Sequence, residues 1–356
     1  MNAPKLLHRL LTAFGPSGAE ESIQRVVHAE IKDVASSCTV DAHGNLLATL
    51  NPDAPMRVII AAHCDQIGFL VQRVDSDGFL FVKSLGGGDE AALAGTRVLV
   101  RTPDGSLRPG VIGKKATHLE TKKERDTVPT KNDIWIDIGA GSQEEAEKAA
   151  PIGTFVTFEP SLTSLSEHLV AAPALDNRLG LYVAVEAFKR LAKAQVKAAI
   201  TLASTVQEEL GSRGAITATQ ALKPHIGVVI DTANATDEPS KVKQSDERCS
   251  LGAGPTLPVG PNINRTLLRS FEATAKEKQI QVQRTPSADL ESNDAKEIQV
   301  AASAVAVVSV GLPLRYMHTP AEVADLRDAE AAIELIAETL LHKLPNSPEE
   351  LAPFRL

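Results

Sequence analysis

The sequence predicts an α/β fold with a mostly parallel sheet, interrupted by a β-rich insertion, and three observations lead to this class. The chain has 356 residues, enough for about two domains of typical size. Hydrophobic residues make up 43% of the chain and charged residues 23%, as in folded globular proteins. Strand and helix patterns alternate before residue 67 and after residue 160, whereas short strands and tight turns fill the part between them.

The first part of the chain carries two helix patterns followed by two strand patterns. Apolar residues at helical spacing predict a helix over residues 6–14. Ser17 with Glu20 three residues later has the pattern of a capping box, so a second helix is expected to begin at Ser17. Strands are predicted over 45–50 and 57–62. The second of these is apolar on both faces, as a covered central strand is.

Residues 67–159 follow a different pattern, which predicts a β-rich insertion of a usual domain size. Strand patterns over 69–74 and 79–82 flank a turn sequence. One short helix is predicted there, with Ser142 and Glu145 as its capping pair. The predicted boundaries are residues 1–66 plus 160–356 for the first domain and 67–159 for the inserted one.

The α/β alternation resumes after residue 160, which favours a sheet of mostly parallel strands. Each segment is assigned from its apolar spacing, with a period near 3.6 for helices and near 2 or continuous for strands. Helices are predicted over 179–193, 213–221, 265–278, from about 294, and over 328–343, and strands over 198–206, 226–230, 281–284 and 304–310.

Charge and composition exclude several classes of partner. The chain has 37 basic and 45 acidic residues, a net charge of −8, so no basic surface is expected to hold nucleic acid. Three cysteines without metal or redox spacing are typical of a reducing compartment, and we expect a cytoplasmic protein. The most apolar stretch, 300–314, contains Gly311 and Pro313 and falls short of the ~20 residues that cross a bilayer, so no membrane partner is expected.

Acidic and imidazole side chains follow three of the predicted strands, at the point where each strand ends. Ligands of open α/β sheets bind beyond the carboxyl ends of the strands, so these side chains are expected to meet at one edge. Asp176 comes just ahead of the helix 179–193, whose positive end favours an anionic group. The candidate residues are His63, Asp176, Glu208, Glu209, Asp231 and His318.

Two imidazoles and four carboxylates cannot share a small site without cations, because like charges at close range raise the pKa of the acids strongly. Two divalent ions would offset three ligand carboxylates and leave the fourth free for chemistry. Nitrogen and oxygen ligands without thiolate favour zinc, with cobalt or manganese as possible substitutes. The sequence therefore predicts a two-metal site.

Five segments, taken in order, resemble the successive motifs of the M42 metallo-aminopeptidases, a family that includes tetrahedral and glutamyl aminopeptidases and members once labelled endoglucanases. The resemblance extends over nearly the whole chain. The segments are His63-Cys-Asp-Gln-Ile-Gly68, Ala174-Leu-Asp-Asn-Arg-Leu-Gly180, Val206-Gln-Glu-Glu-Leu-Gly211, Asp231, and Arg315-Tyr-Met-His-Thr-Pro-Ala-Glu322.

The resemblance implies a dinuclear metal centre that hydrolyses N-terminal residues from short peptides. Glu208 would be the general base, with a metal-bridging water as the nucleophile. Asp65 would hold the free ring nitrogen of His63. The implied ligands are Asp176, which bridges the two ions, His63 and Asp231 at one ion, and Glu209 and His318 at the other.

The resemblance also implies a zinc-peptidase catalytic domain, with residues 67–159 as a PDZ-like domain that mediates dimer formation. Dimers of this family commonly join into hollow tetrahedral dodecamers. Gln66, Asn177 and Gly88 depart from residues common in the family, and none of them is an implied ligand.

Two other functions fit parts of the pattern. Paired carboxylates also serve glycoside hydrolysis, but one Trp and two Tyr are few for a sugar site, and that mechanism does not use the two histidines. The third alternative is a non-enzymatic, cage-forming protein with an inactive site. The presence of all six candidate residues argues against it. Three neighbouring features are given structural roles: Cys64 as a buried apolar residue, Arg315 as an ion-pair partner, and 117–133 as a solvated loop.

Overall fold

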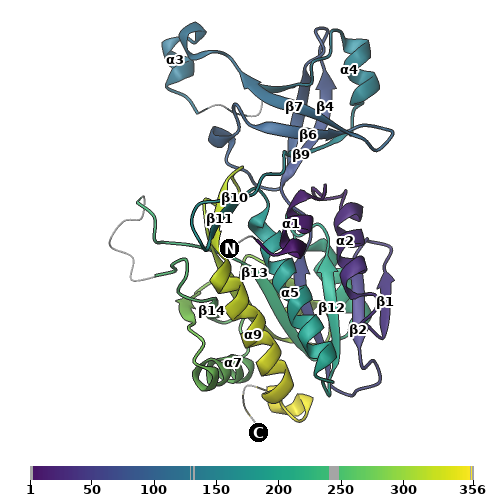
Figure 1. Ribbon diagram of the computed structural model, residues 1–356, viewed down its shortest axis with the longest axis vertical. Helices are drawn as coiled ribbons and strands as arrows, with labels where there is room; N and C mark the ends of the chain where they lie inside the picture. Colours follow the sequence, from purple (N-terminus) through teal and green to yellow (C-terminus); the bar gives the residue numbers. More distant parts are fainter. Residues whose placement is uncertain (1–2, 129, 131–132, 240–247, 353, 355–356) are drawn as a thin grey trace.

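A computed structural model describes residues 3–128, 130, 133–239, 248–352 and 354. In the lower part of Figure 1, helices lie in front of a large sheet, and a β-barrel stands above them. The mixed α/β fold and the β-rich insertion predicted from the sequence are thus present. No helix among these residues combines the length and the apolar character needed to span a bilayer.

The large sheet is parallel at its centre and antiparallel at both sides. Its strands are β1 (Ser37–Val40), β2 (Leu46–Leu50), β3 (Arg57–His63), β10 (Thr163–Ser164), β11 (Leu169–Ala172), β12 (Ala199–Thr205), β13 (Ile226–Asn234), β14 (Thr256–Val259), β15 (Gln283–Pro286), β16 (Ala306–Arg315) and β17 (Glu322–Asp325). They lie in the order β1-β2-β12-β3-β13-β16-β17-β11-β10, and β14 joins β15 to β16. The neighbours β12, β3, β13 and β16 run parallel. The parallel arrangement that the alternation predicts is therefore limited to this central group and to the pair β14–β15.

The helices of this part are α1 (Lys5–Thr12), α2 (Glu21–Ile31), α5 (Leu175–Lys193), α6 (Arg213–Leu222), α7 (Arg265–Lys278), α8 (Asp294–Ala301) and α9 (Leu326–His342). Strand β3 shows how they cover the sheet. Val58 and Ile60 belong to the core that includes α5 and α9, whereas Ile59 and Ala61 belong to the core under α6 and α8. This confirms a central strand that is buried on both faces.

The predicted capping box at the start of the second helix is wrong. Helix α2 begins at Glu21, and no side chain caps it. The Ser17 hydroxyl instead donates a hydrogen bond to the buried carboxylate of Asp65, 2.6 Å away. Glu20 Oε1 accepts from the Gly18 N–H at 2.7 Å. The local pattern is overridden because Asp65, far away in the sequence, competes for the serine hydroxyl.

The insertion is a closed antiparallel barrel with its own hydrophobic core. Its strands are β4 (Gly68–Val74), β5 (Leu80–Leu85), β6 (Arg97–Arg101), β7 (Leu107–Lys114), β8 (Ile134–Asp137) and β9 (Phe155–Phe158). Ser142 caps helix α4 (Gln143–Ala149) as predicted, since its side chain accepts from the Glu145 N–H. The expected solvated loop instead contains a short helix, α3 (Lys122–Arg125), capped by Thr121. Residues 129, 131 and 132 of that loop lie outside the described part of the chain.

A buried arginine on helix α5 links the N-terminal segment to the entry of the barrel. The Arg178 guanidinium is fully buried and donates to the carbonyl oxygens of Leu10 and Gly15 at 2.8 and 2.9 Å. It also donates to Gln66 Oε1 at 3.0 Å, and the Gln66 amide donates to the Thr157 hydroxyl at 2.6 Å. These contacts fix the entry and exit of the barrel beside the carboxyl edge of the sheet.

Candidate metal centre

The six candidate residues meet at the carboxyl edge of the four central strands, as the strand-end rule predicts. His63 ends β3, Asp231 lies in β13, and Glu208 and Glu209 follow β12. His318 follows β16 with a left-handed backbone (φ +62°). All six line one cleft of about 700 Å³.

Asp176 lies between two histidines and joins two groups of possible ligands. His63 Nε2 is 3.3 Å from Asp176 Oδ1 and 3.6 Å from Asp231 Oδ1. His318 Nε2 is 3.4 Å from Asp176 Oδ2 and 3.6 Å from Glu209 Oε2. Within each group the possible ligand atoms lie within 4.8 Å of one another. The two carboxylate oxygens of Asp176 thus face different groups.

These separations fit metal ligation better than hydrogen bonding. Strong charge-assisted hydrogen bonds join nitrogen and oxygen at about 2.7–2.9 Å. Two ligands that hold zinc tetrahedrally at about 2.0–2.2 Å lie about 3.4 Å apart, close to the separations of His63 and His318 from their carboxylates. Asp176 Oδ1 is buried and makes no hydrogen bond within the described chain. The residues present therefore fit a dinuclear divalent-metal site.

The acids of the centre carry more charge than nearby cations offset. Burial raises the pKa of Glu208 to about 8, although His63 opposes the shift. Burial and then the charge of Asp176 raise the pKa of Glu209 well above its usual value. Burial also acts on Asp176, but the neighbouring imidazoles of His318 and His63 outweigh it and lower its pKa. Divalent cations would relieve this crowding of negative charge.

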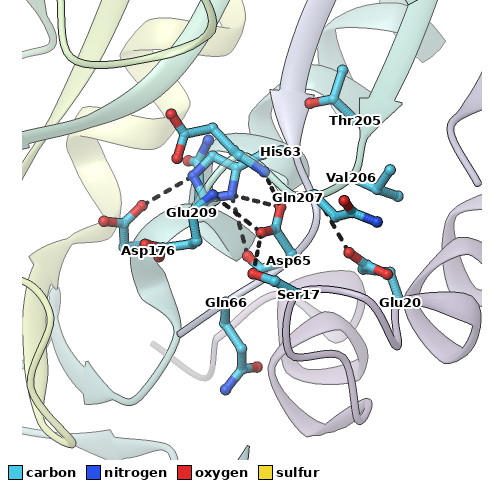
Figure 2. A network of polar contacts seen from close by, with 12 residues as sticks. Ser17, Glu20, His63, Asp65, Gln66, Asp176, Thr205, Val206, Gln207 and Glu209 are labelled. Atoms are coloured by element: carbon cyan, nitrogen blue, oxygen red, sulfur yellow. Dashed lines mark hydrogen bonds and ion pairs between the residues drawn. The ribbon is translucent and has the colours of Figure 1, made fainter. Parts of the chain in front are cut away.

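Asp65 supports the centre from below, as Figure 2 shows. Its carboxylate accepts the backbone N–H groups of Glu208 and Glu209 at 3.0 and 3.2 Å, together with the Ser17 hydroxyl. The same residue faces the second ring nitrogen of His63, with Nδ1 3.2 Å from its backbone oxygen and 3.4 Å from Oδ1. One fully buried side chain thereby contacts the segments that carry His63, Glu208 and Glu209.

Glu322 is a supporting residue that the sequence analysis did not assign. It is buried at the start of β17, and its two oxygens accept the backbone N–H groups of Asp176 at 3.0 Å and His318 at 2.9 Å. It therefore holds the backbone of Asp176 and that of His318 in register. The sequence offered one indication of this role: Glu322 lies four residues after His318, within the segment 315–322 that resembles a family motif.

A glycine loop from the barrel forms one wall of the site and was also missed. Gly86 has φ +79°, and a Cβ on it would lie 3.0 Å from Glu209 Oε2 and 2.8 Å from Ile67 Cγ2. The Asp89 N–H donates to the His318 carbonyl oxygen at 3.2 Å. The barrel thus touches both Glu209 and His318. Three consecutive glycines were the signal, but the sequence does not say what approaches them.

Two neighbours of the site have the structural roles expected from the sequence. Arg315 forms a bidentate pair with Asp237 at 2.7 Å, which confirms the predicted ion pair. Cys64 is fully buried, and burial raises the pKa of its thiol, so it has the inert character expected.

Comparison with known proteins agrees with this geometry. The family model of the M42 glutamyl aminopeptidases matches residues 44–335. Lysyl aminopeptidase of Pyrococcus furiosus is 37% identical over 352 residues, 98% of this chain and 99% of that protein. The TET aminopeptidase of the marine sediment archaeon Thaumarchaeota archaeon SCGC AB-539-E09 superposes with a TM-score of 0.92 and 28% identity, covering 98% of both chains. The TET1 peptidase of Pyrococcus horikoshii, which can assemble into a tetrahedron or a large octahedral shell, has a TM-score of 0.84 at 30% identity, covering 96% of this chain and 99% of its own. The chain therefore belongs to the M42 family of aminopeptidases, hydrolases that act on peptide bonds.

Proposed function

We propose that this protein is a dinuclear metal-dependent aminopeptidase that removes N-terminal residues from short peptides. The observation that carries the proposal is the position of Asp176, whose two oxygens face a His63–Asp231 group and a His318–Glu209 group. These five residues would hold two divalent ions, which we propose to be zinc, with cobalt or manganese as substitutes. When bound, the ions would polarise the scissile carbonyl and lower the pKa of the attacking water.

Glu208 is the proposed general base. It lines the cleft but belongs to neither group of ligand atoms, so its carboxylate is free to face substrate and water. The Ser212 hydroxyl donates to Glu208 Oε1 at 3.2 Å and orients it. Glu208 takes a proton from the attacking water and returns it to the leaving amine nitrogen, which completes hydrolysis.

Hydrolysis of aminoacyl p-nitroanilides with and without a chelator tests this function. We expect release of p-nitroaniline, its loss on chelation and its return when divalent ions are added. A cellulose substrate in the same assay tests the glycosidase alternative. Turnover of cellulose but not of any aminoacyl substrate would contradict the aminopeptidase proposal.

Gly86→Ala is expected to lower the metal content from two ions to about one per chain. The added methyl group would press on Glu209 Oε2, a ligand atom of the His318 group, while the His63 group stays intact. Gly95→Ala is a matched control, because Gly95 also has a positive φ (+89°) but faces open space. Elemental analysis of the purified variants measures the effect. Two ions in both variants would show that the barrel does not position this ligand.

Self-association is expected, because structural neighbours of the chain are assembled peptidases. We propose a homododecamer built from dimers, with residues 67–159 forming the dimer contact and an internal chamber that admits short peptides. Light scattering should give about twelve times the chain mass of 37.8 kDa. A stable monomer across the micromolar range would refute the assembly while leaving the chemistry untouched.

The proposal also includes the predicted cytoplasmic location and the absence of nucleic acid or membrane partners. It rests on the acidic charge balance and on the sparse set of three cysteines without metal or redox spacing.

A further inference from the structure

One wall of the cleft is polar and holds few apolar groups. It is built by β14, β15 and the segment 287–293 that leads into α8. Among the described residues that line the cleft, Met317 is the only long apolar side chain, and no Phe, Tyr or Trp lines it. This wall is therefore poorly suited to a large apolar side chain. Its small lining residues include Thr256, Pro258, Thr285, Pro286, Ser287 and Ser292.

Two charged residues remain in the cleft besides the metal centre, Glu291 and Lys296. Two divalent ions would balance the charge of the four acids at the centre, so these two side chains set the remaining local charge. Neither forms an ion pair within the part of the chain that the structure describes. A half-buried carboxylate without a cation is unfavourable, and a positively charged ligand would relieve it.

Glu291 is held in a fixed position. Its backbone N–H donates to Asn262 Oδ1 at 3.2 Å, and Asn262 is itself locked to Gln299 by two hydrogen bonds of 2.8 and 3.1 Å. On the other side, the Asn293 amide donates to the Ser309 hydroxyl at 3.1 Å. The segment is anchored on both sides of Glu291, so the backbone that carries this carboxylate is held in place.

Glu291 also lies on the metal-centre side of the cleft. Burial raises its pKa, and the charge of Asp231 raises it further, while a hydrogen bond from Ser287 opposes the shift. Both Glu291 and Asp231 line this cleft. The side chain of an N-terminal residue bound with its scissile carbonyl at the metal centre can reach this wall, because both line one cleft.

We propose that Glu291 selects peptides whose N-terminal residue is lysine or arginine, by pairing with the charged end of that side chain. This rests on the proposed aminopeptidase function and names its substrate class. The α-ammonium group is common to all peptides, so pairing with Glu291 there would give no preference among side chains. Lys296 would favour acidic residues if it instead lay beside the bound side chain.

Initial rates on Lys-, Arg-, Leu- and Glu-p-nitroanilide test the proposal, with metal content matched between variants. The wild-type enzyme should prefer Lys and Arg over Leu and Glu. Glu291→Gln should lower the Lys:Leu ratio of kcat/KM by about 10-fold to 100-fold, mainly through KM. Glu291→Lys should invert the preference toward Glu. Lys296→Met, a change of charge in the same wall, should keep Lys preferred over Leu.

Three outcomes would overturn the assignment. A wild-type preference for Leu or Glu would show that the wall does not select a basic side chain. Equal losses for Lys and Leu in Glu291→Gln would place the carboxylate at the α-ammonium group instead. Loss of the Lys preference in Lys296→Met but not in Glu291→Gln would show that Lys296, and not Glu291, determines the preference. Failure of the enzyme to cleave any of the four substrates would instead refute the proposed function itself.

Discussion

Glu208→Gln is expected to retain two ions per chain and to lose turnover by about 100-fold to 10,000-fold, the usual contribution of a general base. The side chain lies outside both groups of ligand atoms, so the amide should not disturb metal binding. It can still accept the hydrogen bond from Ser212, but it cannot take a proton from water. Metal content by elemental analysis and kcat on an aminoacyl p-nitroanilide together measure the effect.

The matched control is Glu209→Gln, a change of the same kind at the next residue. Glu209 Oε2 faces His318 and belongs to a ligand group, so this variant should lose an ion. If both variants lose the same amount of metal, or if Glu208→Gln keeps most of its turnover, the roles given to these two neighbours are wrong.

Asp176→Asn is expected to lose both ions and at least as much activity as Glu208→Gln. Asp176 alone contributes to both ligand groups, and an amide offers one neutral oxygen in place of two charged ones. Asp231→Asn is the natural comparison, because Asp231 belongs to the His63 group alone and should cost one ion. Metal titration followed by calorimetry separates the two variants. Retention of two tightly bound ions by Asp176→Asn would exclude a bridging role.

The central part of the site could be predicted because strand ends are local features. Val58 to His63 has the apolar pattern of a buried strand, and the residues after such strands must meet at one edge of the sheet. The same reasoning predicted that Glu208, Glu209 and Asp231 lie at this edge. It needed no knowledge of how the sheet's outer strands pair.

The supporting contacts could not be predicted, because they join residues that are distant in the sequence. Ser17 has the sequence context of a helix cap, but its hydroxyl donates to Asp65, which lies 48 residues further along the chain. Gly86 belongs to the barrel, yet its closest neighbours include Glu209. Glu322 binds the backbone N–H groups of Asp176 and His318, and because every residue except proline has such a group, the sequence does not indicate which ones it binds. The antiparallel flanks of the sheet were missed because short strands such as β10 leave little pattern to detect.

The number of ions bound per active chain tests the account most directly. Chelator-treated protein should be inactive, and titration with zinc or cobalt should restore activity as the bound metal approaches two ions per chain, measured by elemental mass spectrometry. The same titration of Asp176→Asn should restore none. Full activity in protein that binds no divalent metal, or saturation of activity with no ion at the His318 group, would contradict the dinuclear centre built around Asp176.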